Sequence, residues 1–101
     1  MKHLEYKGEK LPVECNWGAI EDLQEETGKT DLTKLTLKDT RILCYYSLKE
    51  GHRIAGKELK YTLDDLRGMM GVIGMQFTGM LPDFLGRMTG GEAAPSETSK
   101  S

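Results

Sequence analysis

The side chains that most often carry chemistry are few in this chain and widely spaced. The two histidines, His3 and His52, belong to no HExxH pattern and to no group of Cys and His residues that would hold zinc. The two cysteines, Cys15 and Cys44, lie far apart without CxxC spacing, so in a reducing compartment we expect free core thiols. The sequence therefore predicts no metal site.

Patterns for a nucleophile or a nucleotide are also weak. Ser47 and Cys44 fall in the middle of an apolar helical pattern, where a nucleophile would be buried away from its substrate. The glycines Gly68, Gly71 and Gly74 do not form a Walker or dinucleotide loop, because no lysine follows them and they sit inside a helical pattern. We expect no enzyme activity and no cofactor.

One group of basic residues surrounds a glycine-flanked loop, and two glutamates interrupt it. Its members are Lys49, His52, Arg53, Lys57 and Lys60. Such a mixed group is weak evidence for phosphate contact and is more typical of a solvated surface. The chain holds 14 Lys and Arg against 16 Asp and Glu, a net charge of −2, whereas nucleic-acid binding needs a concentrated basic patch. We expect no nucleic-acid partner.

The most informative feature is the uncharged stretch GMMGVIGMQFTGMLP, residues 68–82. Every methionine except the first residue lies in or just after it: Met69, Met70, Met75, Met80 and Met88. Methionine is soft and unbranched, so a surface built from it repacks around different apolar partners. Each glycine in the stretch costs a helix interior about 1 kcal/mol relative to alanine. The composition predicts a site that acts by binding.

Helical spacing divides this stretch into an apolar arc and a strip of glycines. The predicted partner-binding residues are Met69, Met70, Ile73, Phe77, Met80, Leu81, Phe84 and Leu85. The strip, made of Gly68, Gly71 and Gly74, permits close approach of another backbone or marks a helix that unwinds. Pro82 is expected to break the helix, leaving a short apolar helix after it.

One other interpretation of residues 68–88 stays open, and two membrane interpretations are disfavoured. An apolar stripe near the end of a small domain is often ordinary core. A membrane span is not expected, because 15 uncharged residues fall short of the roughly 18 to 20 that cross a bilayer. A peripheral membrane surface is also disfavoured, because Lys and Arg are scarce near the stretch.

The beginning of the chain predicts a β-hairpin. Apolar and charged residues alternate over residues 4–6 and again over 11–15, and Lys7, Gly8 and Glu9 form the turn between them. Pro12 is tolerable only on an edge strand.

A first helix is expected from Asn16, which caps it, to Gly28, which ends it. One side of this helix carries Trp17, Ile20, Leu23 and Thr27, and the other carries Glu21, Asp22, Glu25 and Glu26. The acidic side is interpreted as a solvated face, with docking of a basic partner as the alternative.

Two more capped helices are expected. Thr36, with Asp39 three positions on, begins a helix that we expect to end at Gly51. Its apolar residues point nearly all the way round, so it should be the central element. Thr62 repeats the pattern with Asp65 and opens a third helix at residue 63, after a short extended piece at residues 59–61.

These elements predict a mainly α fold with a small N-terminal β-hairpin (α+β), about three to four helices packing around a central second helix. Residues 1–88 are expected to form a single globular domain. Residues 89–101 contain no large apolar residue, so we expect a disordered tail. The charged start MKHLEYKGEK is not followed by an apolar run, so no secretory signal is expected and the predicted location is the cytoplasm.

The order of these elements resembles a known family. A short hairpin, the stretch WGAIEDLQEETGK and a helix ending in YYSLKEGHRIAGKELKYTLDDL are similar to the tail assembly chaperones of long-tailed bacteriophages and prophages. The resemblance covers about residues 1–67. It implies a holdase that coats the aggregation-prone tape-measure protein, helps to recruit tail-tube subunits, and often has a longer frameshifted form.

The leading hypothesis is therefore a cytoplasmic assembly chaperone, in the host cytoplasm if a phage encodes it, that covers apolar helices of a tape-measure-type partner with residues 69–88. The alternative is a small structural virion or tail subunit, or another oligomeric interaction protein, that uses the same segment as a permanent interface. A peripheral membrane protein is the third hypothesis.

Overall fold

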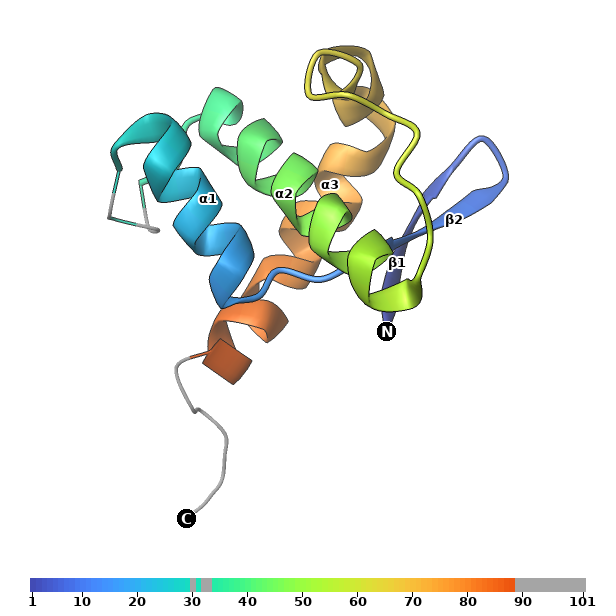
Figure 1. Cartoon of the computed structure of the whole chain (residues 1–101). Coiled ribbons are helices and arrows are strands. Elements are labelled where there is room, and N and C mark those ends of the chain that lie inside the picture. The colour runs from blue at the N-terminus through green and yellow to red at the C-terminus, as the bar shows by residue number, and fades with distance from the viewer. Residues whose placement is uncertain (30, 32–33, 89–101) are drawn as a thin grey trace.

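The computed structural model describes residues 1–29, 31 and 34–88 and shows a two-stranded antiparallel hairpin followed by three helices (Figure 1). The elements are β1 (Lys2–Tyr6), β2 (Glu9–Val13), α1 (Trp17–Thr27), α2 (Leu37–Ala55) and α3 (Leu66–Met88). The predicted fold class, mainly α with an N-terminal hairpin, is confirmed. The expected tail at residues 89–101 lies outside the described residues.

The hairpin turns on two residues with positive φ, Lys7 at 50° and Gly8 at 79°. Two such residues in succession are the signature of a type I′ turn, whose twist matches that of the flanking strands. Tyr6 therefore pairs with Glu9 directly across the turn. This pairing sets the register of the whole hairpin.

The register explains why a proline fits in β2. In an antiparallel pair, hydrogen-bonded and non-hydrogen-bonded residue pairs alternate. Counting from the turn, Leu4 and Leu11 form a bonded pair, and His3 and Pro12 form the non-bonded pair beside it. The N–H that Pro12 lacks would have pointed away from β1, so the ladder loses no hydrogen bond.

Helix α3 covers the outer edge of β1. The Glu5 N–H donates to Oε1 of Gln76 over 2.8 Å, and Nε2 of Gln76 donates back to the Glu5 carbonyl over 3.0 Å. One glutamine side chain thus satisfies both backbone groups that Glu5 turns away from β2. Unpaired strand edges invite association with other chains, so this contact also protects the hairpin.

Helix α2 approaches β2 so closely that only glycine fits at the contact. A Cβ atom on Gly51 would lie 2.4 Å from the carbonyl oxygen of Pro12. One turn earlier on α2, the Ser47 carbonyl accepts a hydrogen bond of 2.9 Å from the Glu14 N–H. The start of the chain is therefore fixed against the middle of α2.

Helix α1 begins and ends as expected. The Asn16 side chain accepts from the Ala19 N–H over 3.0 Å, and Gly28 adopts φ of 74° beyond the last turn. The prediction that Trp17 shares the buried side is wrong, because Trp17 is 67% exposed. The buried stripe is centred between Ala19 and Ile20, roughly a third of a turn away from Trp17.

The predicted capping box of α2 is confirmed, but the predicted end is wrong. The Thr36 N–H donates to Oδ2 of Asp39 over 3.0 Å, and the Asp39 N–H donates to Oγ1 of Thr36 over 3.1 Å. The helix continues past Gly51 to Gly56, whose φ of 70° ends it. Gly51 provides room for the hairpin and keeps a helical conformation.

The cap of α3 also forms, one turn before the regular helix. Thr62 and Asp65 exchange two hydrogen bonds of 2.8 and 3.1 Å, while the helix itself begins at Leu66. The short extended piece expected at residues 59–61 forms no strand in the structure.

The expectation that Pro82 breaks α3 is also wrong, because the helix runs through it to Met88. Phe84, two residues further on, is fully buried. We attribute the continuation of the helix to this packing, which opposes the local cost of the proline.

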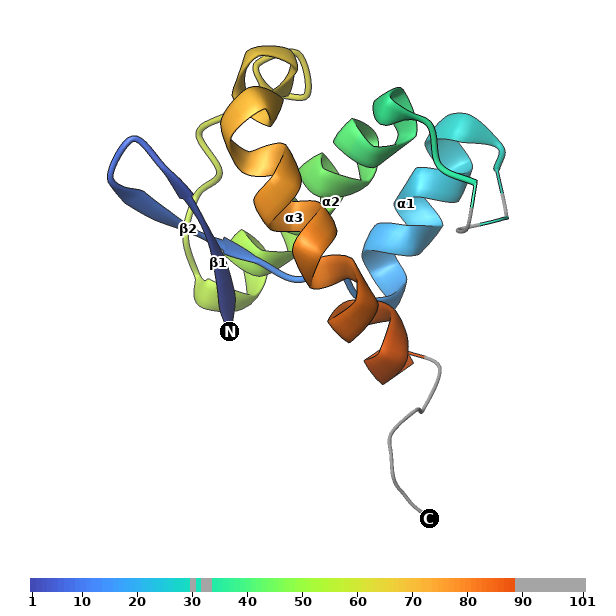
Figure 2. The same cartoon turned by 180° about the vertical axis from the view of Figure 1, so that it is seen from behind.

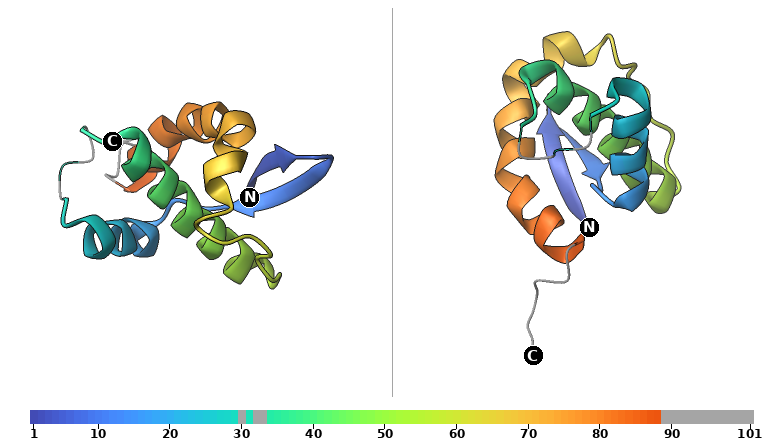
Figure 3. Two further views of the ribbon diagram at one scale, coloured as in Figure 1. Left: turned by 90° about the horizontal axis from the view of Figure 1, so that it is seen from above. Right: turned by 90° about the vertical axis from the view of Figure 1, so that its left-hand side faces the viewer.

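Helix α2 is the central element, as predicted. It packs against α1, α3 and β2, and α1 and α3 flank it (Figure 3). A single apolar core joins all five elements: Leu4, Leu11, Val13, Cys15, Ala19, Ile20, Leu23, Ile42, Leu43, Cys44, Leu48, Leu66, Met69, Ile73, Phe77 and Phe84.

We predict opposite effects for two Gly-to-Ala replacements. Gly51→Ala should lower the free energy of unfolding by about 2 kcal/mol or more, since the new methyl group collides with the Pro12 backbone. Gly68→Ala, on a helix position with nothing within 4 Å, should raise it by about 1 kcal/mol. Urea unfolding of both variants measures these changes. Equal effects would contradict the close approach of α2 to the hairpin.

We also predict that Asp39 contributes to the pH dependence of stability. Hydrogen bonds from Lys29, at 2.7 Å, and from the Thr36 N–H hold the pKa of the Asp39 carboxyl below its ordinary value. A lowered folded-state pKa stabilises the fold above the ordinary pKa, and this contribution is lost as pH falls through the folded-state pKa.

Asp39→Asn should therefore destabilise the protein near neutral pH, and the difference from wild type should shrink as pH falls toward about 3. Urea midpoints of the two proteins across this range test the claim. A difference that grows on acidification would contradict it.

Candidate functional site

Four of the eight predicted partner-binding residues belong to the core. Met69, Ile73, Phe77 and Phe84 are buried on the inner face of α3. The prediction that they form a binding surface is wrong for this structure. The hairpin and α2 leave an apolar face that α3 has to cover, and these side chains cover it.

The other four predicted residues are half-buried. Met70, Met80 and Leu81 pack against the core, and Leu85 is similarly half-buried near the end of α3. Among the eight, Met70 alone lines the open groove between α2 and α3. The accessible part of the methionine-rich segment is therefore different from the part that helical spacing singled out.

The groove lies between the beginning of α2 and the first half of α3. The two helices cross, so that their first turns diverge (Figure 2). The space between them is about 890 Å³. We call it the α2–α3 groove, and it is lined by Leu37, Lys38, Thr40, Arg41, Arg67, Met70, Gly71, Gly74, Met75 and Thr78.

Two glycines leave backbone exposed on the α3 side of this groove. A Cβ atom on Gly71 would meet nothing within 4 Å, and one on Gly74 would meet only the Met70 side chain, at 3.5 Å. The predicted strip of glycines thus faces away from the core. Because these positions carry no side chain, a ligand backbone has room to approach α3 closely.

Apolar side chains stand exposed around the same groove. Leu37 is 91% exposed at the start of α2, and Met75 is 87% exposed on α3. Val72, also on α3, is 53% exposed. Leu37 and Met75, the two most exposed large apolar side chains of the described residues, thus both line one groove, an arrangement typical of an interaction site.

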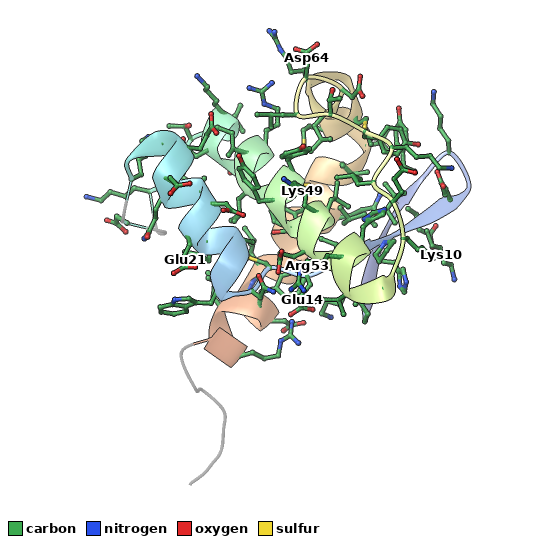
Figure 4. The ribbon with its side chains drawn as sticks, viewed as in Figure 1. Lys10, Glu14, Glu21, Lys49, Arg53 and Asp64 are labelled. Carbon is green, nitrogen blue, oxygen red and sulfur yellow. The ribbon has the colours of Figure 1, made fainter. Side chains whose placement is uncertain are left out.

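The groove carries three positive charges and no carboxylate. Lys38 and Arg41 line the α2 side, and Arg67 lines the α3 side. Arg67 lies 3.9 Å from Asp64, but both side chains are largely exposed, and Asp64 extends outward before α3 (Figure 4). Such a surface pair is weak.

The outer face of α3 carries no charge between Arg67 and Asp83. Its exposed residues between these two positions are Gly68, Gly71, Val72, Met75, Thr78, Gly79 and Pro82. They share one side of the helix over about four turns. A solvent-facing helix side normally carries charged residues, so this face also suits contact with another chain.

The two cysteines and the serine in the middle of α2 are buried. Cys15 and Cys44 are buried free thiols, and burial raises the pKa of Cys15 to about 11 and that of Cys44 to about 12. Both thiols are therefore protonated at neutral pH, and a protonated thiol is a poor nucleophile. Ser47, beside Cys15, is fully buried.

The basic residues near the end of α2 do not converge on one site. Nδ1 of His52 lies 2.7 Å from the Leu48 carbonyl in a buried position, and Arg53 pairs with Glu50 at 2.8 Å. Lys49 lies over the Tyr45 ring. Within the described ranges, no three His, Cys, Asp or Glu side chains gather closely enough to hold a metal ion.

Comparisons with protein-family models, with curated proteins and with solved structures found no match to this chain. The part of the chain that the structure describes holds no helix with the length and apolarity needed to cross a bilayer. The α2–α3 groove is the feature of the described residues that points most directly to a function.

The α2 side of the groove is what reasoning from sequence missed. Leu37 fits the apolar pattern of a central helix, and no local pattern indicates that Lys38 and Arg41 line a groove with α3. Their position depends on how the two helices cross, which no local pattern encodes. The glycine strip was the one usable signal.

We predict that the two faces of α3 respond differently to truncation. Phe77→Ala should lower the free energy of unfolding by about 3 to 5 kcal/mol, because it leaves a cavity in the core. Met75→Ala, two residues away, should change it by less than about 0.5 kcal/mol, because that side chain is exposed. Thermal or urea unfolding measures both. Similar values for the two variants would contradict this orientation of α3.

Proposed function

We propose that this protein is an assembly chaperone that binds apolar helices of a partner in the α2–α3 groove. The observation that carries the proposal is an open groove of about 890 Å³ with exposed glycine backbone and exposed apolar side chains. A folded chain that leaves such a surface open is suited to shielding apolar segments of another protein.

A helix is the ligand that this groove fits best. Helices pack with their axes about 8 to 10 Å apart, and glycine at the contact allows a shorter distance. Gly71 and Gly74 supply that contact on α3. Met70 and Met75 lie beside them, and their flexible side chains adapt to different apolar surfaces.

The resemblance to phage tail assembly chaperones suggests the partner. We propose a tape-measure-type protein as the client, with tail-tube subunits as further partners, in the cytoplasm of the host. The resemblance implies an aggregation-prone client, and a chaperone for such a client needs a surface that accepts varied apolar sequences. The methionine-lined groove meets that need.

A second candidate is a structural subunit that uses the outer face of α3 in a permanent oligomer. The uncharged, exposed surface from Gly68 to Pro82 favours this alternative. Val72 lies on that face but does not line the groove. Light scattering of the wild type and of Val72→Glu distinguishes the two functions. An oligomer that Val72→Glu dissociates supports the structural subunit, whereas a wild-type monomer supports the chaperone.

We predict that filling the groove abolishes chaperone activity without unfolding the protein. In Gly71→Leu, the new side chain should occupy the space that a client helix needs, and the helix itself should be slightly stabilised. Light scattering by an aggregating apolar helical protein, mixed with each variant, measures the protection. We expect loss of protection with the melting temperature unchanged or raised.

Gly79→Leu is the matched control. Gly79 is also on α3 and exposed, with nothing within 4 Å of a Cβ, but it does not line the groove. This variant should protect the client as the wild type does. Full protection by Gly71→Leu, or equal loss in both variants, would contradict the groove as the site.

A further inference from the structure

We propose that the α2–α3 groove selects helices with acidic residues on both flanks of their apolar stripe. This inference rests on the proposed function and names the chemistry of its partner. It is carried by the placement of Lys38 and Arg41 on one wall and Arg67 on the other.

The three cations are a local feature, because the chain as a whole has a net charge of −2. Lys38 and Arg41 are three positions apart on α2 and therefore lie on the same side of it. Arg67 stands across the groove at the start of α3. A ligand lying between the walls meets positive charge on both sides.

Two of these cations pair with no carboxylate in the part of the chain that the structure describes. Among the described residues, Lys38 and Arg41 form no ion pair, whereas Lys29, Arg53 and Arg87 pair with carboxylates at 2.7 to 3.2 Å. Arg67 has only the long, exposed contact with Asp64, which a ligand carboxylate displaces at small cost. The cations of the groove are therefore available to pair with carboxylates of a ligand.

The apolar residues and the cations that line the groove together determine which helix it binds. The apolar stripe of a helix packs against Met70, Met75 and the glycine backbone, while its flanking side chains reach the walls. Carboxylates at the flanking positions of the ligand helix complement the three cations, whereas lysines at those positions are repelled. The cations therefore discriminate between helices that have the same apolar stripe. Screening by salt should weaken this discrimination.

An anionic lipid surface is negatively charged, as an acidic helix is, but it fits the shape of the groove poorly. The groove lies between two helices that cross (Figure 2), and the residues that line it include Gly71 and Gly74, whose backbone is open. A single helix can lie along the groove and contact this glycine backbone, whereas the flat surface of a bilayer would contact only the side chains that project at the edges of the groove. The structure therefore favours a helical protein segment.

The test uses two peptides of about 18 residues with the same leucine and alanine stripe. One carries glutamate and the other lysine at the flanking positions. Their dissociation constants for the full chain are measured by fluorescence anisotropy at low salt and at roughly 0.5 M salt. We expect the glutamate peptide to bind about tenfold more tightly at low salt, with the difference shrinking at high salt.

Two variants with the same charge change make the test specific. Arg41→Glu should abolish or invert the preference for the glutamate peptide. Lys57→Glu, an exposed residue in the loop after α2 that does not line the groove, should leave the preference unchanged. Melting temperatures of both variants control for the fold.

The outcomes separate this inference from the proposed function. Equal binding of both peptides by wild type and Arg41→Glu, with loss of both in Gly71→Leu, would overturn the acidic preference and leave helix binding intact. Failure of the wild type to bind either peptide would overturn both. Binding of vesicles containing phosphatidylserine that depends on Arg41, without a preference between the peptides, would assign the groove to lipid and overturn the proposal.

Discussion

The structure depends on the burial of one face of α3 against α2 and the hairpin. Helix α2 and the hairpin together leave an apolar surface that α1 does not cover. Leu66, Ile73 and Phe77 of α3 cover this surface. A two-stranded hairpin is marginal by itself and needs a helix to pack against. Gln76 adds polar contacts from the same helix to the edge of β1. Helix α3 thus completes the core that the hairpin begins.

This burial explains how α3 tolerates so many glycines. The core contacts of its inner face offset the low helix propensity of the glycines, each of which costs about 1 kcal/mol relative to alanine. Glycines then remain on the outer face without breaking the helix, and Gly71 and Gly74 leave the α2–α3 groove open. Stability and binding are therefore divided between two sides of one element. The same sequence segment is both core and exposed surface.

Local patterns were sufficient to predict the hairpin, the caps at Asn16 and Thr36, and the central position of α2, because each depends on neighbouring residues or on periodicity. They failed where tertiary contact decides. Gly51 looked like a helix end but is required by the approach of Pro12, and Pro82 looked like a break but lies before the buried Phe84. Only one side of the groove could be predicted from the sequence. The glycine strip on α3 is a local pattern, whereas the cations of α2 reach the groove because the two helices cross.

The central claim is that the α2–α3 groove binds a helix while the inner face of α3 remains core. Backbone amide chemical shifts of the labelled full chain, recorded during titration with an apolar helical peptide that carries glutamate flanks, test it most directly. We expect the changes to concentrate at residues 37–41 and 67–78 and to leave the hairpin and α1 unaffected. Changes confined to α1 or the hairpin, or spread over the core residues of every element, would contradict the claim.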